Sequence, residues 1–283
     1  MDENENAPRS DSRRSGNSPR RETAPKRSLG QNFLVDGRYA EAIVRRAELS
    51  EGDWVIEIGP GRGALTRRLL ERGVQLLAVE KDAQLAAELA ASLGGPPRLM
   101  VHEGDVLNMD VTSLLPADVI PIVVSNLPYN VSVPILFQLL RHRDRIARMI
   151  LMFQKEVADR LAAEPDSREY GIPTVLAWLS CQIDTLFDVP PSAFRPRPKV
   201  ISTVIRVTPF AEPRIPITDR LFFERMLNLL FQKRRKTLSR SLKMSGYALP
   251  SGVDPPIDLK RRVDTLDPRE LVALSDWLRS ATR

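Results

Sequence analysis

The sequence predicts an α/β protein, with a mostly parallel sheet covered by helices on both faces and a small all-helical C-terminal domain. Three observations lead to this prediction. Apolar strand-like runs alternate with amphipathic helix-like runs over most of the chain, the pattern becomes entirely helical from about residue 209, and the 283 residues suffice for one large or two modest domains. Strands that alternate with helices in this way lie parallel in one sheet.

The first elements follow in order from hydrophobic periodicity and from glycine stop signals. A helix is expected at residues 39–49. Apolar runs bounded by turn residues then predict five strands, at 53–59, 74–80, 98–105, 120–126 and 147–153. Helices are expected between and after these strands, at 64–73, 83–95, 133–143 and 154–164.

The pattern changes after this alternation. A helix expected at 170–182 precedes two strand-like runs that flank a proline-rich loop, 183–189 and 202–209. One long helix is then predicted from 218 to 246, opening on a Thr-Asp start signal. A last helix opens with Asp267 before a proline, which is a cap followed by a suitable first-turn residue.

The chain divides at these changes of pattern. Residues 1–25 hold Ser, Asn, Pro and Arg but few apolar side chains, so they predict a disordered tail. Such a tail either helps to hold a nucleic acid or is a solvated leader. The rest divides into an α/β domain at 26–208 and a helical domain at 209–283.

Composition narrows the class of protein. Hydrophobic content of 42% and charged content of 28% are typical of a soluble globular protein. The apolar runs are far too short to span a bilayer, and residues 1–28 are too polar for a signal peptide. The lone Cys181 cannot form an internal disulfide, so we expect a cytoplasmic protein. A net charge of +6 favours a polyanionic partner.

A glycine-rich turn follows the first predicted strand of the sheet. The run "EIGPGRGALT" places Gly59, Gly61 and Gly63 there, where glycine lets the backbone approach a ligand with positive φ. The spacing is G-x-G-x-G rather than the G-x-G-x-x-G of dinucleotide sites. The turn therefore predicts a nucleotide site but not a pyrophosphate cradle.

Two acids follow the next two strands. Glu80 ends the second strand, where a carboxylate can accept both hydroxyls of a ribose. Asp105 follows the third strand, where it can receive an adenine amino group. A glycine turn with these two acids indicates an adenosine ligand without pyrophosphate, and S-adenosylmethionine fits that description better than NAD.

The run "SNLPYN" leaves the fourth strand beside this site. The side-chain oxygen of Asn126 and a backbone carbonyl such as that of Leu127 can grip the hydrogens of a base amine and favour its pyramidal, nucleophilic form. Tyr129 can stack on the base, and Pro128 keeps the amide and the ring at a fixed separation. This pattern predicts methyl transfer to an exocyclic amine.

The motifs also carry a family resemblance. Nine runs occur in order between Lys26 and Leu242: "SLGQNFLVD", "VIEIGPGRGALT", "VEKD", "EGDVL", "NLPYN", "FQKEVADRL", "SREYG", "PPSAFRPRPKV" and "FQKRRKTLSRSL". Together they resemble the bacterial small-subunit ribosomal RNA adenine dimethyltransferases, the KsgA/RsmA group. The resemblance implies a Rossmann-like methyltransferase fold with seven strands and a helical C-terminal domain. It also implies transfer of four methyl groups to N6 of two adjacent adenosines near the 3′ end of small-subunit RNA.

The resemblance adds three residues to the site. It places Asn32 and Leu34 along the methionine and ribose parts of S-adenosylmethionine, with Asn126 and the glycine turn as further cofactor contacts. It makes Phe194 a second wall of the target pocket, although a packing role in the proline-rich loop is the alternative. It implies the immature small ribosomal subunit as partner, and we expect a monomer without a metal.

A basic run in the C-terminal half predicts contact with RNA phosphates. Residues 233–243 hold six basic residues and no acid. Helical spacing would place Lys233, Lys236 and Arg240 on one side, and Arg234 on the next. The alternative is a solvated charged face. The proposed RNA contacts are Lys233, Arg234, Arg235, Lys236 and Arg240, together with Arg197 and Lys199 beside Phe194.

Two other functions stay open at this point. One is a large-subunit RNA adenine methyltransferase of the antibiotic-resistance type, which shares the fold and the Asn-x-Pro-Tyr motif. The other is a ribosome-assembly factor whose catalysis is dispensable. The runs "NLPYN" and "FQKRRKT" favour the small-subunit group, and the complete set of site residues favours an active enzyme.

Overall fold

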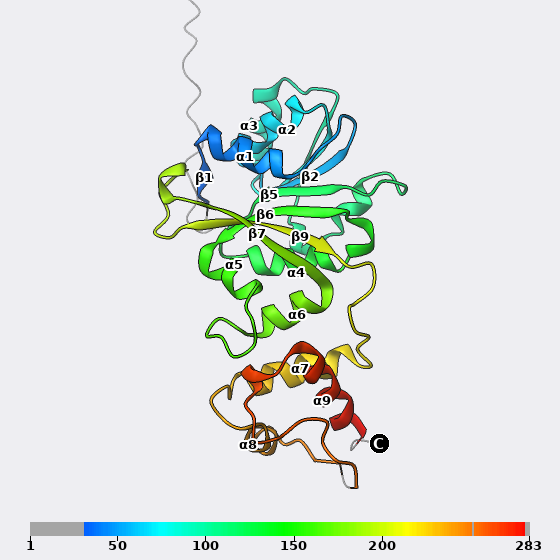
Figure 1. Cartoon of the computed structure of the whole chain (residues 1–283). Coiled ribbons are helices and arrows are strands. Elements are labelled where there is room, and N and C mark those ends of the chain that lie inside the picture. The colour runs from blue at the N-terminus through cyan, green and yellow to red at the C-terminus, as the bar shows by residue number, and fades with distance from the viewer. Residues whose placement is uncertain (1–30, 251, 281–283) are drawn as a thin grey trace, which may run out of the picture.

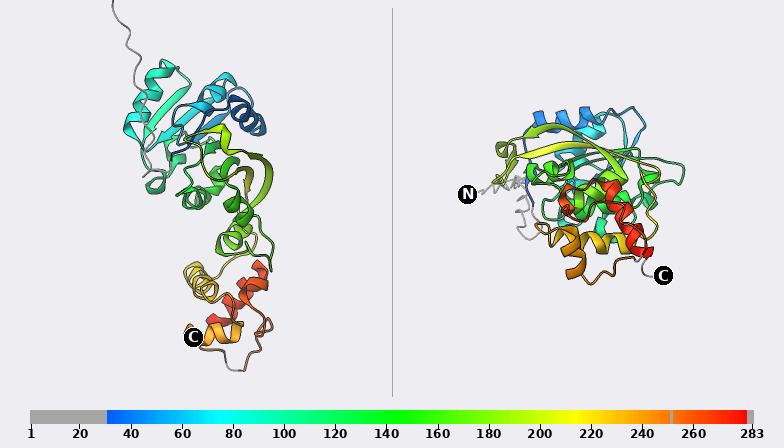
Figure 2. Two further views of the ribbon diagram at one scale, coloured as in Figure 1. Left: turned by 90° about the vertical axis from the view of Figure 1, so that its left-hand side faces the viewer. Right: turned by 60° about the horizontal axis from the view of Figure 1, so that its bottom comes forward.

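The computed structural model describes residues 31–250 and 252–280. The predicted tail at 1–25 lies outside this range. Figure 1 shows two parts, an α/β unit that carries the sheet and a helical unit beneath it, and the turned view in Figure 2 shows the same separation. The fold class predicted from the sequence is confirmed.

Within the described residues the main sheet has seven strands, in the order β4-β3-β2-β5-β6-β9-β7. Six of them run parallel and β9 runs opposite, because β9 pairs antiparallel with both β6 and β7. The strand bounds are β2 Trp54–Ile58, β3 Gln75–Glu80, β4 Leu99–Glu103, β5 Ile122–Asn126, β6 Arg148–Gln154, β7 Cys181–Val189 and β9 Ser202–Pro209. All seven lie at or within two residues of the predicted runs.

Alternating side chains of the strands supply two hydrophobic layers, one on each face of the sheet. On β2, Val55 faces one layer while Ile56 and Ile58 face the other. The first layer is covered by helices α1 (Gly37–Arg46) and α2 (Ala64–Glu71). Helices α3 Ala83–Leu93, α4 Ser132–Leu140, α5 Lys155–Leu161 and α6 Ile172–Ser180 complete the α/β unit. Central strands buried on both faces explain the nearly continuous apolar runs in the sequence.

A short two-stranded ribbon was not predicted. Strand β1 (Phe33–Leu34) pairs antiparallel with β8 (Phe194–Arg195), with Leu34 opposite Phe194. The backbone N–H of Val35 extends the contact by donating to the Ala193 carbonyl at 2.8 Å. This ribbon ties the segment before α1 to the proline-rich loop and so holds residues 31–34 over the end of the sheet.

The C-terminal unit contains three helices, α7 (Arg220–Phe231), α8 (Leu238–Met244) and α9 (Pro268–Ser280). The Asp219 carboxylate caps α7 by accepting the Phe222 N–H at 3.0 Å. The prediction of one helix from 218 to 246 was wrong, because the chain leaves the helix after Phe231. Thr237 instead pairs with Arg262 as an isolated bridge, which redirects the chain before α8 begins.

Helix α6 connects the two units. Tyr170, Val175 and Leu179 are buried in the same cluster as apolar residues of α7, α8 and α9. The Tyr170 hydroxyl also donates to the Leu266 carbonyl at 2.8 Å. We propose a domain boundary between residues 208 and 209. Helix α6 then belongs to the α/β domain and packs against the C-terminal helices.

Candidate active site

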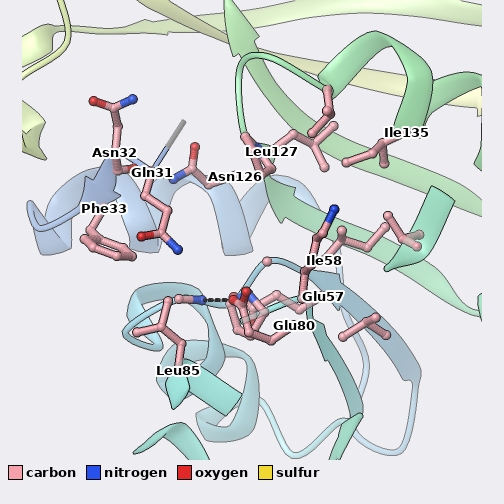
Figure 3. Close-up of a pocket in the computed structure, with 18 of the residues that line it drawn as sticks. Gln31, Asn32, Phe33, Glu57, Ile58, Glu80, Leu85, Asn126, Leu127 and Ile135 are labelled. Carbon is pink, nitrogen blue, oxygen red and sulfur yellow. Dashed lines mark hydrogen bonds between the residues drawn. The ribbon is translucent and has the colours of Figure 1, made fainter. Parts of the chain in front are cut away.

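A pocket lies at the carboxyl ends of β2 to β5, which is where open α/β sheets bind ligands. Ten of the predicted site residues line it: Asn32, Leu34, Gly59, Gly61, Glu80, Asp105, Asn126, Leu127, Pro128 and Tyr129. Figure 3 looks across the pocket, with Glu80 on one side and Asn126 and Leu127 on the other. Residues far apart in sequence therefore meet at one site.

The order of the strands determines the order of the groups. Asp105 follows β4, Glu80 ends β3, the glycine turn follows β2, and Asn126 ends β5. Because β4, β3, β2 and β5 are neighbours in that order, these groups lie along one edge of the sheet in the same sequence. An adenosine held by the two acids would extend past the glycine turn toward Asn126.

The glycine turn has the positive φ angles that its glycines predicted. Gly61 has a φ of +52°, and a Cβ built on it would lie 2.9 Å from the ring of Phe33. Its N–H donates to Oε2 of Glu80 at 3.1 Å. A side chain at this position would be strained and would collide with Phe33, so the turn requires glycine.

Glu80 is a buried carboxylate held by backbone donors. Its Oε1 accepts the Asp82 N–H at 3.0 Å, in addition to the Gly61 bond at Oε2. Burial raises the pKa of Glu80, and these two hydrogen bonds oppose the rise by favouring the charged form. The side chain is thus fixed in direction before any ligand binds.

Asp105 is held by different partners. The Lys81 ammonium lies 2.7 Å from its Oδ2, and its Oδ1 accepts the Leu107 N–H at 3.1 Å. The hydrogen bond from Lys81 lowers the pKa of Asp105, with the Leu107 bond acting in the same direction. Each carboxylate oxygen has further lone pairs, so Asp105 can still accept from a ligand amine.

Asn126 and Tyr129 stand at the other end of the pocket. The Asn126 Nδ2 donates to the Asn32 carbonyl at 3.2 Å, which uses the donor end of the amide and leaves its oxygen as an acceptor. The Tyr129 hydroxyl lies 2.6 Å from Oγ of Ser202 on β9. Burial raises the pKa of this phenol. The two side chains are therefore oriented by the residue that precedes β1 and by β9 respectively.

Glu57 also lines the pocket and was not selected from the sequence. It is 2% exposed and its Oε2 accepts the Thr66 hydroxyl of α2 at 2.7 Å. Burial raises the pKa of Glu57 to about 8; the Thr66 hydrogen bond opposes the rise and the nearby Glu80 adds to it. Alternation along β2 could have indicated it, since Glu57 falls on the face that Val55 shares with α2.

The structure places Phe194 outside the pocket. Its side chain is 0% exposed and belongs to the hydrophobic layer beneath α1 and α2. It pairs with Leu34, which does line the pocket. This burial favours the packing role that was its alternative, and its role as a second wall of the target pocket stays a prediction.

The basic residues are not all on the surface. Arg235, Lys236, Arg240, Arg197 and Lys199 are exposed. Arg234 instead donates to the carbonyls of Ser167 and Arg168 at 2.6 and 2.8 Å, and to Asp264 at 3.0 Å. Lys233 donates to Ser245 at 3.1 Å. Since residues 232–236 form a turn and a bend between helices, the helical spacing assumed for Lys233 and Lys236 does not apply.

Two further findings concern the class of protein. Across residues 31–250 and 252–280, no group of three or more His, Cys, Asp or Glu side chains is arranged to hold a metal ion. In the same part of the chain, none of the helices combines the length and the apolar character needed to cross a membrane.

Comparisons with known proteins agree with one another. A family model described as ribosomal RNA adenine dimethylase matches residues 23–279. The chain is 43% identical to ribosomal RNA small subunit methyltransferase A of Syntrophotalea carbinolica, over 90% of this chain and 97% of the relative. It is 40% identical to the protein of that name in Geobacter sulfurreducens, over 90% of this chain and 96% of the relative.

Two solved structures resemble the fold over most of the chain. A dimethyladenosine transferase from Plasmodium falciparum matches with a TM-score of 0.71 and 25% identity, over 86% of this chain and 95% of that one. The 23S rRNA methyltransferase ErmE matches with a TM-score of 0.61 and 26% identity, over 88% of this chain and 100% of that one.

Proposed function

The chain belongs to the ribosomal RNA adenine dimethylase family, and we propose that it methylates N6 of two adjacent adenosines near the 3′ end of small-subunit ribosomal RNA. The product is N6,N6-dimethyladenosine. The observation that carries this proposal is the row of groups along the sheet edge, in which an adenosine site leads directly to Asn126 and Tyr129. The small-subunit substrate is supported by relatives at 40–43% identity over nine tenths of the chain.

The pocket fits S-adenosylmethionine as the methyl donor. Gly59 and Gly61 present their backbone to the pocket, while Glu80 and Asp105 offer acceptors for ribose hydroxyls and an adenine amine. Glu80 and Asp105 are also acids, which suits a ligand that carries a sulfonium and an ammonium. When bound, this cofactor supplies an electrophilic methyl group.

The role of Asn126 is to prepare the target amine. An adenine N6 lone pair is delocalised into the ring, so the amine is a weak nucleophile. The Asn126 oxygen and the Leu127 carbonyl accept its two hydrogens and favour a pyramidal nitrogen aimed along the row of groups. The bond from Asn126 to the Asn32 carbonyl fixes which way the amide points.

Tyr129 and Pro128 position the base. Stacking of a base on an aromatic ring contributes about 1–3 kcal/mol in nucleic-acid sites. The bond between the Tyr129 hydroxyl and Ser202 holds the ring at a fixed angle to the sheet. Phe194 contributes indirectly, by packing behind Leu34 and holding β1 in place.

The exposed lysine and arginine side chains provide the RNA contacts. We assign this role to Arg235, Lys236 and Arg240 of the C-terminal unit and to Arg197 and Lys199 of the proline-rich loop. Arg234 serves the fold instead. The enzyme acts as a monomer on the immature small subunit in the cytoplasm, where it takes part in subunit maturation.

A large-subunit substrate is the second candidate, favoured by the likeness to ErmE at 26% identity. Purified protein is incubated with radiolabelled S-adenosylmethionine and undermethylated small subunits, and the labelled nucleoside is identified after digestion. Dimethyladenosine in small-subunit RNA is the expected product. Label only in large-subunit RNA would support the second candidate, and cofactor binding without label in either RNA would indicate an assembly factor.

A further inference from the structure

Strand β6 ends on a polar side chain that the cofactor pocket does not use. Gln154 is the last residue of β6 and lies in the run "FQKEVADRL". It is half-buried, and although it immediately precedes α5, its side chain does not cap that helix. Among the residues that the structure describes, none is a hydrogen-bond partner of its amide. A half-buried amide without a protein partner is available to a ligand.

The strand register places Gln154 next to the target side of the site. Strand β6 lies between β5 and β9 in the sheet (Figure 1). Asn126 at the end of β5 is in register with Met152, two residues before Gln154. Side chains two residues apart on a strand share a face, and Met152 packs in the same hydrophobic layer as Val124 of β5. Gln154 is therefore on the same face as Asn126, one step nearer the carboxyl edge.

The side chain of Tyr129 passes across the end of β6. Tyr129 follows β5, yet its hydroxyl lies 2.6 Å from Oγ of Ser202 at the start of β9. Ser202 is the residue directly opposite Gln154 in the antiparallel pair of β6 and β9. The phenol thus reaches from the β5 side of β6 to the cross-strand partner of Gln154. A base stacked on Tyr129 would present its edge to the Gln154 amide.

The chemistry of adenine determines what this amide can do. The N6 amine of adenine is flanked by two ring nitrogens, N1 and N7, and both are hydrogen-bond acceptors. With the two N6 hydrogens held by the Asn126 oxygen and the Leu127 carbonyl, the base edge beside the amine offers only these acceptors. The Nε2 of a glutamine is a donor of matching planar geometry, and glutamine amides pair with adenine edges in this way.

We propose that Gln154 binds the target adenine by donating from its Nε2 to a ring nitrogen next to N6, either N1 or N7. This proposal rests on the proposed function and deepens it, since it names a residue that recognises the base to be methylated. Gln154 orients the base and takes no part in cofactor binding.

Substrates that lack one ring nitrogen at a time test this role. Small subunits are reconstituted with RNA that carries adenosine, 1-deazaadenosine or 7-deazaadenosine at the target positions, and kcat/KM is measured with the full chain. Gln154→Met keeps the length of the side chain without its hydrogen-bonding groups. On adenosine this variant should lose about 10-fold in kcat/KM, as expected for one hydrogen bond. On the deaza base without the contacted nitrogen, variant and unaltered protein should be equal, and on the other deaza base the loss should persist.

Matched variants separate donation from packing. Gln154→Glu replaces the donor by a carboxylate of the same shape, so its rate on adenosine should fall at least as far as that of Gln154→Met. Gln182→Met removes an exposed glutamine of β7 that donates to Asp184, and it should change none of the three rates. Binding of S-adenosylhomocysteine, measured by calorimetry, should be unchanged in all three variants.

Three outcomes would overturn the proposal. A loss in Gln154→Met that is equal on all three substrates would mean that the amide acts on another group, such as a neighbouring nucleotide. Full activity of Gln154→Glu would mean that the oxygen end of the amide is used. Unchanged rates in Gln154→Met would assign the amide to solvent. If the unaltered protein methylated no adenosine-containing subunits, the proposed function itself would fail, and this result does not depend on any variant.

Discussion

The pocket and the C-terminal unit use charged residues in opposite ways. In the pocket, Glu80 and Asp105 are fixed by backbone donors or by Lys81, and both carboxylates line the cavity. In the C-terminal unit, Arg234 and Arg235 are neighbours in one turn, yet Arg234 is bonded inward to three acceptors and Arg235 is exposed. A charged residue in a motif therefore indicates a binding role only where the fold leaves its side chain accessible to a partner.

The largest expected effect is at Asn126. Asn126→Ala removes the acceptor that orients the target amine, so methyl transfer should fall by about 10²–10³-fold or more, the scale known for loss of one oriented catalytic hydrogen bond. Cofactor affinity, measured by calorimetry, should change only slightly. Asn228→Ala on α7, where the exposed amide donates to the Glu224 carbonyl of the same helix, is the control. Unchanged turnover in Asn126→Ala would contradict the proposal that Asn126 binds and orients the target amine.

Substitution of Glu80 should have the opposite effect, weakening cofactor binding more than turnover. Glu80→Ala removes the ribose acceptor and the partner of the Gly61 N–H, so cofactor affinity should fall by about 10- to 100-fold. At saturating cofactor the rate should recover much of its value. A loss confined to the rate at saturation, with unchanged affinity, would contradict the ribose role.

The two adjacent arginines test the comparison directly. Arg234→Gln leaves Asp264 and two carbonyls without their donor, so the free energy of unfolding should fall by about 2 kcal/mol. For a chain of this size that is a drop in Tm of roughly 4–8 °C. Arg235→Gln should leave Tm unchanged and should reduce the slope of log binding constant against log salt by about one for small-subunit RNA. Exchange of these two results would show that the inward and outward roles are assigned the wrong way round.

Per pH unit, the smallest expected effect on stability is at Glu57. The pKa of Glu57 is raised to about 8 in the fold, whereas an unfolded glutamate titrates near 4.5. Its contribution to stability is therefore fully present below about pH 4.5 and is lost as the pH rises toward 8, because the buried carboxyl must then ionise. The slope is at most about 1.4 kcal/mol per pH unit. Glu57→Gln should flatten the fall of Tm between pH 5 and 8, and an unchanged slope would mean that Glu57 does not titrate in this range.

The sequence was most informative where periodicity and function coincide. The central strands of the sheet are buried on both faces, so their apolar runs stand out, and strands such as β3 and β5 end at a residue of distinct chemistry, Glu80 and Asn126. The β1–β8 ribbon could not be predicted, because two-residue strands have no period and their partner is distant in sequence. The break after Phe231 depends on the bridge between Thr237 and Arg262, which local helix signals do not reveal.

The sequence also did not reveal the residue roles that depend on burial. Phe194 lies in a motif beside prolines and bases, yet its pairing with Leu34 places it in the core. Arg234 and Arg235 are the same residue type in the same run, and only the carbonyls of Ser167 and Arg168 distinguish them. Alternation along β2 indicates the face on which Glu57 lies, but its contact with Thr66 of α2 shows only in the structure.

The row of groups along the sheet edge is tested most directly by a crystal structure of the protein with S-adenosylhomocysteine. We expect the adenine at Asp105, the ribose hydroxyls on Glu80, and the sulfur beside the glycine turn and directed toward Asn126. An adenosine bound in the reverse direction, or a ligand that leaves Asn126 distant from the sulfur, would contradict the account of how this fold brings cofactor and target amine together.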